Sequence, residues 1–292
     1  MKSSAFVNLA LHDLKCSQKE LAEKIGVSPT QISNWKYDEY MSAEMELKFR
    51  EITKIGNEEP GLILMVGSLD QAKKWEDLIL YLTGEPALEY ECGCYKILET
   101  LQQMGVKIPN DFPEELNYRP AVLNEATEAN LTFESNPFVR SITAIFVAYL
   151  DVNDFFIRNI TGLWASYEDM FKNCHEIWDL QSMLLRLAAA KIEVDAEFAP
   201  LSAQFKDDVF LNARICISGI KAKAFHNRVP IGVELLDMIY KDGKQLRDEL
   251  EVRMATQRTG INEQIHPDFY MNEILLKTRA IYDAVAAQKG NP

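Results

Sequence analysis

Residues 17–36 read SQKELAEKIGVSPTQISNWK, and this stretch opens with a strong helix-start signal. Ser17 and Glu20 have the spacing of a capping box, in which the serine hydroxyl and the glutamate carboxylate each bond the other residue's backbone amide. Gly26 suits the left-handed backbone that follows a helix. We therefore expect a short helix between the capping box and this glycine.

A second start signal follows at once. Ser28 can cap a helix, Pro29 is suited to the first helical position, and Gln31 lies at the third. Two capped short helices joined by Gly26-Val27 predict a tight helix-turn-helix. Flanking helices are expected over residues 4–14 and, after Ser42, to about residue 55.

The apolar residues of this stretch agree with the same arrangement. Leu21 and Ala22 are expected to pack, because the small Ala22 allows close approach of two helices. Val27, Ile32 and Trp35 are expected to face the core of the small domain.

The caps, the glycine, the small alanine and the apolar spacing together resemble the helix-turn-helix of the phage-repressor family (Cro/C1 type, XRE-like). The resemblance covers about residues 4–55. It implies a DNA-binding domain whose second helix lies in the major groove of double-stranded DNA, with its N-terminal residues toward the base edges.

The predicted DNA contacts follow from this placement. With Ile32 and Trp35 buried, the groove-facing residues are Pro29, Thr30, Ser33 and Asn34. Asn34 is the best candidate for reading a base, since its amide can bond N6 and N7 of adenine together. The family resemblance implies phosphate or flanking contacts by Gln18, Ser28 and Gln31. Ser17 and Lys36 complete the predicted set as phosphate contacts.

The loop after the second helix differs from the family pattern. Members of the family often have a basic loop with a glycine at this place. This chain has instead Lys36-Tyr37-Asp38-Glu39-Tyr40-Met41, which contains no glycine and two acidic residues. Residues 1–54 contain eight Lys or Arg and eight Asp or Glu, so the net charge of -13 belongs entirely to the rest of the chain. We expect modest, salt-sensitive DNA binding that depends on dimerisation. The alternative is a helix-turn-helix that is used for protein contact or that is retained without DNA binding.

The remainder of the chain predicts an all-α protein. We expect three parts: a helix-turn-helix domain (1–56), connecting helices and an irregular segment (57–136), and an α-helical dimerisation or sensing domain (137–292). Residues 62–66 form an apolar run that suits either a strand or a buried helix. Further helices are expected at about 69–82, 90–104, 138–162, 164–185, 200–225, 230–257 (with a possible break at Asp242-Gly243) and 267–287.

Composition and motifs limit the function. The five cysteines predict free thiols rather than a disulfide framework, and no metal site or cofactor is expected. A di-iron Glu-x-x-His motif that ends at His175 would require a glutamate at position 172. That residue is a lysine. Phosphate loops and hydrolase signatures are missing, so we expect no enzyme. The chain has no signal-peptide pattern and no apolar run long enough for a membrane span, which predicts a cytoplasmic protein.

The sequence thus predicts a DNA-binding transcriptional regulator that acts as a homodimer on a pseudo-palindromic operator. Its helical domain is expected to serve dimerisation or the sensing of a small-molecule, peptide or protein effector. The alternative is an interaction protein, such as an antitoxin, an antirepressor or a phage-defence component, whose acidic helical domain binds another protein.

Overall fold

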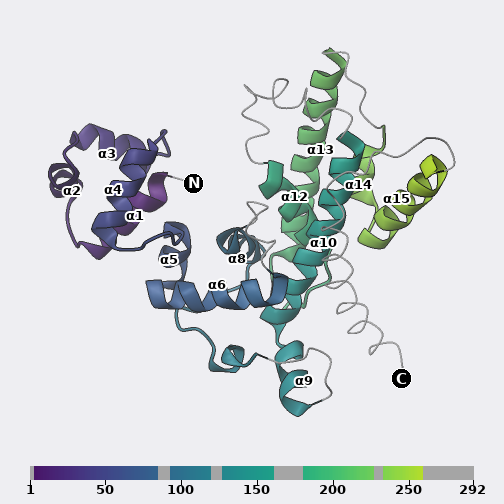
Figure 1. Ribbon diagram of the computed structural model, residues 1–292, viewed down its shortest axis with the longest axis horizontal. Helices are drawn as coiled ribbons and strands as arrows, with labels where there is room; N and C mark the ends of the chain where they lie inside the picture. The colour runs from purple at the N-terminus through teal and green to yellow at the C-terminus, as the bar shows by residue number, and fades with distance from the viewer. Residues whose placement is uncertain (1–2, 85–92, 120–126, 161–179, 227–232, 259–292) are drawn as a thin grey trace. The chain divides into compact units, whose positions relative to one another are not determined.

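All regular elements that the structure describes are helices (Figure 1). The computed structural model describes residues 3–84, 93–119, 127–160, 180–226 and 233–258. The predicted all-α fold is confirmed for this part of the chain. None of its helices is long and apolar enough to cross a membrane.

Contacts within the chain define two compact units. The first comprises Met1–Tyr81 and Lys107–Tyr118, and the second comprises Leu82–Val106 and Arg119–Pro292. The division at residues 56 and 136 that we expect from the sequence stays a prediction.

The first unit begins with the helices of the predicted DNA-binding domain. It contains α1 (Ser3–Asp13), α2 (Gln18–Ile25), α3 (Pro29–Lys36), α4 (Ala43–Thr53), α5 (Pro60–Val66), most of α6 (Leu69–Thr83) and the 3-10 turn η1 (Glu114–Asn117). Helix α1 contacts α3, α4 and α5. The ambiguous run at residues 62–66 is helical, with Leu62, Ile63 and Val66 buried and Leu64 exposed.

An aromatic cluster joins three of these helices. The ring centroids of Phe6 and Phe49 lie 6.1 Å apart, and Trp35 meets Phe49 edge-on at 5.9 Å. All three side chains are buried. Because these residues come from α1, α3 and α4, their contact fixes the position of α3 in the domain.

The turn between α2 and α3 has the predicted geometry. Gly26 adopts a left-handed backbone with φ 77°, and the amides of Gly26 and Val27 both donate to the Ala22 carbonyl, at 2.9 and 3.0 Å. Val27, which we expected to face the core, lies in the turn between the two helices and is partly buried.

Replacement of Gly26 tests this turn. A Cβ at this position would meet no atom within 4 Å, so the cost of Gly26→Ala comes from the left-handed backbone alone. We expect Gly26→Ala to lower the free energy of unfolding by about 1–2 kcal/mol in denaturant titrations. Gly26→Asn is the matched control and should cost less, because asparagine tolerates this conformation better. Equal losses for both variants would contradict the argument.

A pair of carboxyl groups lies between the end of the helix-turn-helix segment and α6. Arg50 donates to the carbonyls of Gly56 and Glu58, both at 2.8 Å, and so fixes the segment that carries Glu58. The Glu76 side chain of α6 bonds Glu58. Burial, followed by this contact with Glu58, raises the pKa of Glu76 from 4.5 to about 7.

This pair predicts a pH-dependent stability. The folded protein holds the Glu76 proton more tightly than the unfolded chain does, so stability falls as the pH rises from about 4.5 to about 7. We expect Glu76→Gln to melt at a higher temperature than the wild type at pH 8, with a smaller difference at pH 5. Glu115→Gln, an exposed change in η1, is the control. A Glu76→Gln effect that does not vary with pH would contradict this assignment.

The second unit is built around a long buried helix. Its elements are α8 (Cys94–Gln103), α9 (Glu128–Ser135), α10 (Pro137–Ile160), α12 (Leu180–Ala189), α13 (Ser202–His226), the 3-10 turn η4 (Val233–Leu236), α14 (Asp237–Tyr240) and α15 (Gly243–Arg258). Helix α10 contacts α9, α12 and α15, and α12 also contacts α8 and α13. The Tyr149 hydroxyl of α10 donates to Gln181 of α12 at 2.5 Å.

Of two predicted helix boundaries in this unit, the structure shifts one slightly and confirms the other. Helix α13 begins at Ser202 rather than at Pro200, and the Leu201 amide just before it donates to the Met104 carbonyl (2.9 Å) at the end of α8. The predicted break at Asp242-Gly243 is confirmed. Asp242 and Gln245 exchange side-chain bonds with each other's amides at the start of α15, as in a capping box.

The start of α15 is tied to the rest of the unit by charged side chains. Arg247 of α15 forms an ion pair with the buried Asp151 of α10. A Cβ added to Gly243 would lie 2.5 Å from an Asp151 carboxylate oxygen, so this carboxylate lies against the first residue of the helix. The Lys191 amine donates to the carbonyls of Ile239 and Lys241, and burial lowers its pKa to about 8.

Several expectations fall outside the described residues. They are the greater part of the helix at 164–185 and the helix at 267–287. Phe155 and Phe156 of α10 are buried. Cys16, Cys94 and Cys216 are free thiols.

Candidate nucleic-acid interface

Helices α2 and α3 form the helix-turn-helix, and α3 presents two different faces. Ile32 and Trp35 are buried, whereas Thr30 is exposed on the opposite side. At about 100° per residue, the exposed face of α3 is centred near Thr30 and includes Ser33 and Asn34. This face is polar, and its side chains can donate and accept hydrogen bonds.

The predicted DNA contacts all lie on this one motif. Ser28, Pro29, Thr30 and Lys36 are exposed, and Gln31, Ser33 and Asn34 are partly exposed on α3 or at its cap. On α2 and at its cap, Ser17 is exposed and Gln18 partly exposed. The structure therefore places these residues at the two helix starts, on the exposed side of α3 and, for Lys36, at the C-terminal end of α3. Their contacts with DNA stay a prediction.

The two helix starts differ in charge. At α2, the Ser17 amide and hydroxyl both donate to a Glu20 carboxylate oxygen, at 2.7 and 2.9 Å. These bonds hold the pKa of Glu20 below its ordinary value. A phosphate that contacts Ser17 would therefore have to displace a carboxylate that already occupies its donors.

The start of α3 carries no acidic side chain in its first turn. The Ser28 hydroxyl accepts from the Gln31 amide at 3.1 Å, and the Thr30 side chain stands exposed beside it. The positive end of this helix dipole is therefore the more favourable of the two positions for a DNA phosphate.

The loop after α3 is held in place by the N-terminus of α1. The Ser3 hydroxyl lies within hydrogen-bond distance of the Trp35 and Glu39 carbonyls (3.0 and 2.7 Å), and Asp38 accepts from the Ser4 amide at 3.0 Å. Asp38 also adopts the left-handed backbone, with φ 62°. Asp38 thus adopts the left-handed conformation that a glycine in this loop would adopt easily. Its carboxylate accepts from the first turn of α1, where a negative charge is favourable.

Two tyrosines in this loop are additional candidate contacts. Tyr37 and Tyr40 are 83% and 86% exposed, whereas Trp35 between α3 and the core is buried. Tyr37 follows Thr30 by seven residues and Asn34 by three, so it continues the exposed face of α3 at its far end. Sequence reasoning missed Tyr37, although the same spacing could have identified it.

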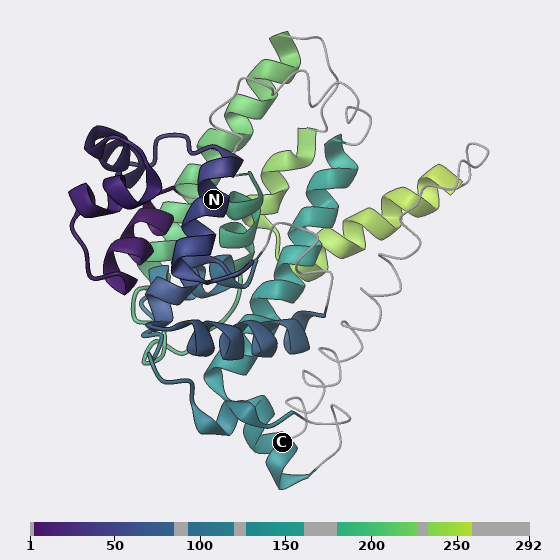
Figure 2. The same ribbon diagram turned by 60° about the vertical axis from the view of Figure 1, so that its left-hand side comes forward.

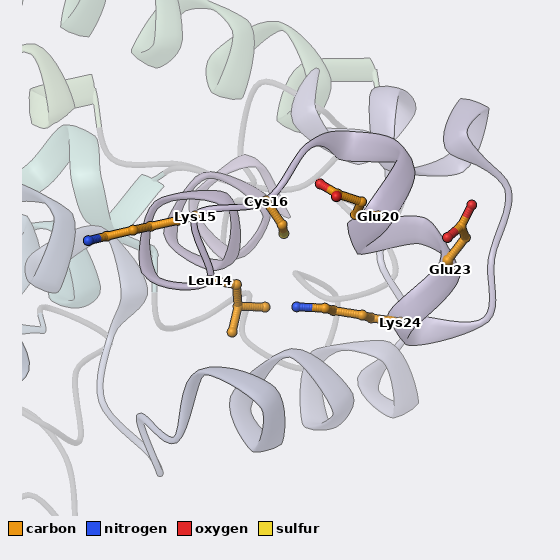
Figure 3. A pocket seen from close by; sticks show the side chains of 6 residues that line it. All are labelled: Leu14, Lys15, Cys16, Glu20, Glu23 and Lys24. Carbon is orange, nitrogen blue, oxygen red and sulfur yellow. The ribbon is translucent and has the colours of Figure 1, made fainter.

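A hollow lies between α2 and the residues that follow α1. It is lined by Leu14, Lys15, Cys16, Glu20, Glu23 and Lys24. Figure 3 shows that Lys24 extends toward Leu14, whereas Lys15 points away. Its lining carries both positive and negative side chains, and Glu20 is already bonded to Ser17. The hollow therefore does not indicate one class of ligand.

Comparison with known families agrees with this geometry. Residues 12–44 match a family model described as Helix-turn-helix, so the predicted resemblance to the Cro/C1-type motif is confirmed. The matched segment includes α2, the turn, α3 and the loop with Tyr37 and Asp38. Neither the curated proteins nor the solved structures gave a match to the chain. Residues 12–44 therefore form a DNA-binding helix-turn-helix, in a chain whose described elements are all helices.

A contact between Tyr37 and the DNA backbone can be tested by removing the Tyr37 hydroxyl group. A tyrosine hydroxyl can donate to a phosphate without adding charge. We expect Tyr37→Phe to weaken DNA binding about threefold to tenfold while leaving the slope of affinity against salt unchanged. Tyr118→Phe is the control, measured by fluorescence anisotropy on the same DNA. Unchanged affinity of Tyr37→Phe would place its hydroxyl away from phosphate.

Proposed function

We propose that this protein is a sequence-specific transcriptional regulator that binds a pseudo-palindromic operator as a homodimer, with α3 in the major groove. The observation that carries the proposal is the polar face of α3, which carries Thr30, Ser33 and Asn34 and whose opposite side is anchored by Trp35. A recognition helix that contacts bases in the major groove needs one side packed in its domain and a polar side exposed to the DNA.

Within this proposal, Asn34 reads a base and Lys36 contacts phosphate. An asparagine amide can form two bonds with adenine, so its loss removes discrimination at one base pair. Lys36 is exposed at the end of α3, where an ammonium group favours any DNA sequence equally. These two roles predict different effects of substitution.

The proposed roles are tested by selecting genomic DNA fragments with the purified full chain. Asn34→Ala should cost about 1–3 kcal/mol on the selected site and relax its sequence preference. Lys36→Ala should weaken binding to all fragments alike and reduce the salt dependence. Gln204→Ala, an exposed change on α13, is the control for a substitution outside the motif.

The same experiment separates this function from its alternative. If no fragment is enriched at low salt, or if both substitutions leave binding unchanged, the proposed DNA contacts are wrong. A stoichiometric protein partner that co-purifies with the chain, together with no DNA selection, would instead favour the antitoxin or antirepressor function.

We further propose that the second unit provides dimerisation or the sensing of an effector, and that the protein acts in the cytoplasm. The unit has a large buried core formed by α10 and α12. Dimerisation through a single helix would not require a core of this size. A screen for ligands that raise the melting temperature of the full chain tests the sensing role.

A further inference from the structure

The face of α3 that is turned away from the core carries no charge. Helix α3 lies beside α1 and α2 among the N-terminal helices, which are drawn in purple (Figures 1 and 2). Its buried residues are Ile32 and Trp35, and at about 100° per residue the opposite face carries Thr30, Ser33 and Asn34. Each of these three side chains ends in hydroxyl, methyl or amide groups. A base edge that meets this face is therefore contacted by neutral groups alone.

The polar groups of this face are available to DNA. Within the described residues, the side chains of Thr30, Ser33 and Asn34 have no hydrogen-bond partner, whereas the Ser28 hydroxyl is bonded to the Gln31 amide in the helix cap. Thr30 is exposed, so its methyl group is accessible as well as its hydroxyl. These groups can contact bases without first breaking bonds within the domain.

The charged residues of the segment lie away from this face. Within Pro29–Lys36 only Lys36 is charged. It lies about 120° around the helix axis from Thr30 and about 9 Å further along it. Asp38, in the loop that follows, accepts from the Ser4 amide at 3.0 Å, so its carboxylate is directed to α1. Neither charge is placed where the N-terminal residues of a recognition helix meet the base edges.

The four bases are recognised in the major groove by different side chains. Guanine is most often bound by an arginine or a lysine, and the N4 amino group of cytosine by a carboxylate. The exposed face of α3 has neither. An amide suits adenine, and a methyl group suits the C5-methyl of thymine, whereas a hydroxyl suits any base. Asn34 and Thr30 supply the amide and the methyl group, and residues four apart on a helix are neighbours on its surface.

We propose that α3 recognises a half-site core of A·T base pairs, in which Asn34 binds N6 and N7 of an adenine and the Thr30 methyl contacts the C5-methyl of a thymine in the same or an adjacent base pair. This inference rests on the proposed function, because it names the class of DNA sequence that the same helix recognises. No side chain of α3 binds guanine in this arrangement, and Lys36 adds affinity through phosphate without a preference for any base.

The base composition is tested by selection from a pool of DNA duplexes with a random central segment, using the purified full chain. We expect A·T pairs at the positions whose preference Asn34→Ala relaxes, and a loss of affinity of about fivefold or more for the enriched duplexes in that variant. Gln204→Ala, the exposed change on α13, is the control and should select the same duplexes as the wild type.

The thymine contact is tested by replacing single thymines of an enriched duplex with uracil, which lacks only the C5-methyl. At one position in each half-site this change should weaken binding of the wild type about threefold to tenfold. Thr30→Ser, which loses the methyl group and keeps the hydroxyl, should bind the thymine and uracil duplexes equally. Thr30→Val, which keeps a methyl group and loses the hydroxyl, is the matched variant and should retain the difference. The same uracil effect in both variants would overturn the thymine contact.

The adenine contact is tested with 7-deazaadenine, in which a carbon replaces the N7 acceptor. This base should weaken binding of the wild type at one position in each half-site, whereas Asn34→Ala should bind both duplexes equally. A 7-deazaadenine effect of the same size in Asn34→Ala would overturn the contact. Circular dichroism checks that each variant keeps its helix content.

The remaining outcomes separate the inference from the proposed function. G·C pairs at the positions that depend on Asn34 would overturn the inference and leave the proposed function standing. A guanine preference that Lys36→Ala removes would also overturn it. Enrichment of A·T pairs that no variant at Thr30 or Asn34 changes would indicate recognition of DNA shape, which contradicts the proposed contacts. If no duplex is enriched at low salt, the proposed function and the inference are both wrong.

Discussion

The contact between Trp35 and the aromatic rings of α1 and α4 is the constraint on which the DNA-binding domain depends. The Trp35 ring packs edge-on against Phe49, and its indole nitrogen donates to the Tyr40 carbonyl at 3.1 Å. Its own carbonyl accepts from Ser3. One residue thus joins the recognition helix to two other helices and to the following loop. Because it is buried at the back of α3, the opposite side of that helix is left exposed.

The local structure of this domain could be predicted from the sequence because its determinants are close together in the chain. The caps at Ser17 and Ser28 and the left-handed Gly26 each act within four residues. Signals of this kind depend little on the rest of the molecule. The same holds for the cap at Asp242, which the sequence indicated as a break in a longer helix.

Features that depend on distant residues could not be predicted. The role of Asp38 requires the amide of Ser4, which is far from it in the chain. The pairing of Glu58 with Glu76, and the bond from Leu201 to Met104 just before α13, likewise arise from tertiary contacts. Helix α13 carries apolar residues on two sides, so periodicity alone could not determine which side is buried. Among the candidate DNA contacts, the missed Tyr37 lies beyond the last residue of its helix.

The close approach of Asp151 to Gly243 restricts how this protein can change over evolutionary time. Any side chain at position 243 would bring its Cβ to 2.5 Å from an Asp151 carboxylate oxygen, so that carboxylate would have to move. Such a movement would disturb the ion pair that gives the partly buried Arg247 its acidic partner. Substitutions at these three positions should therefore depend on one another over evolutionary time.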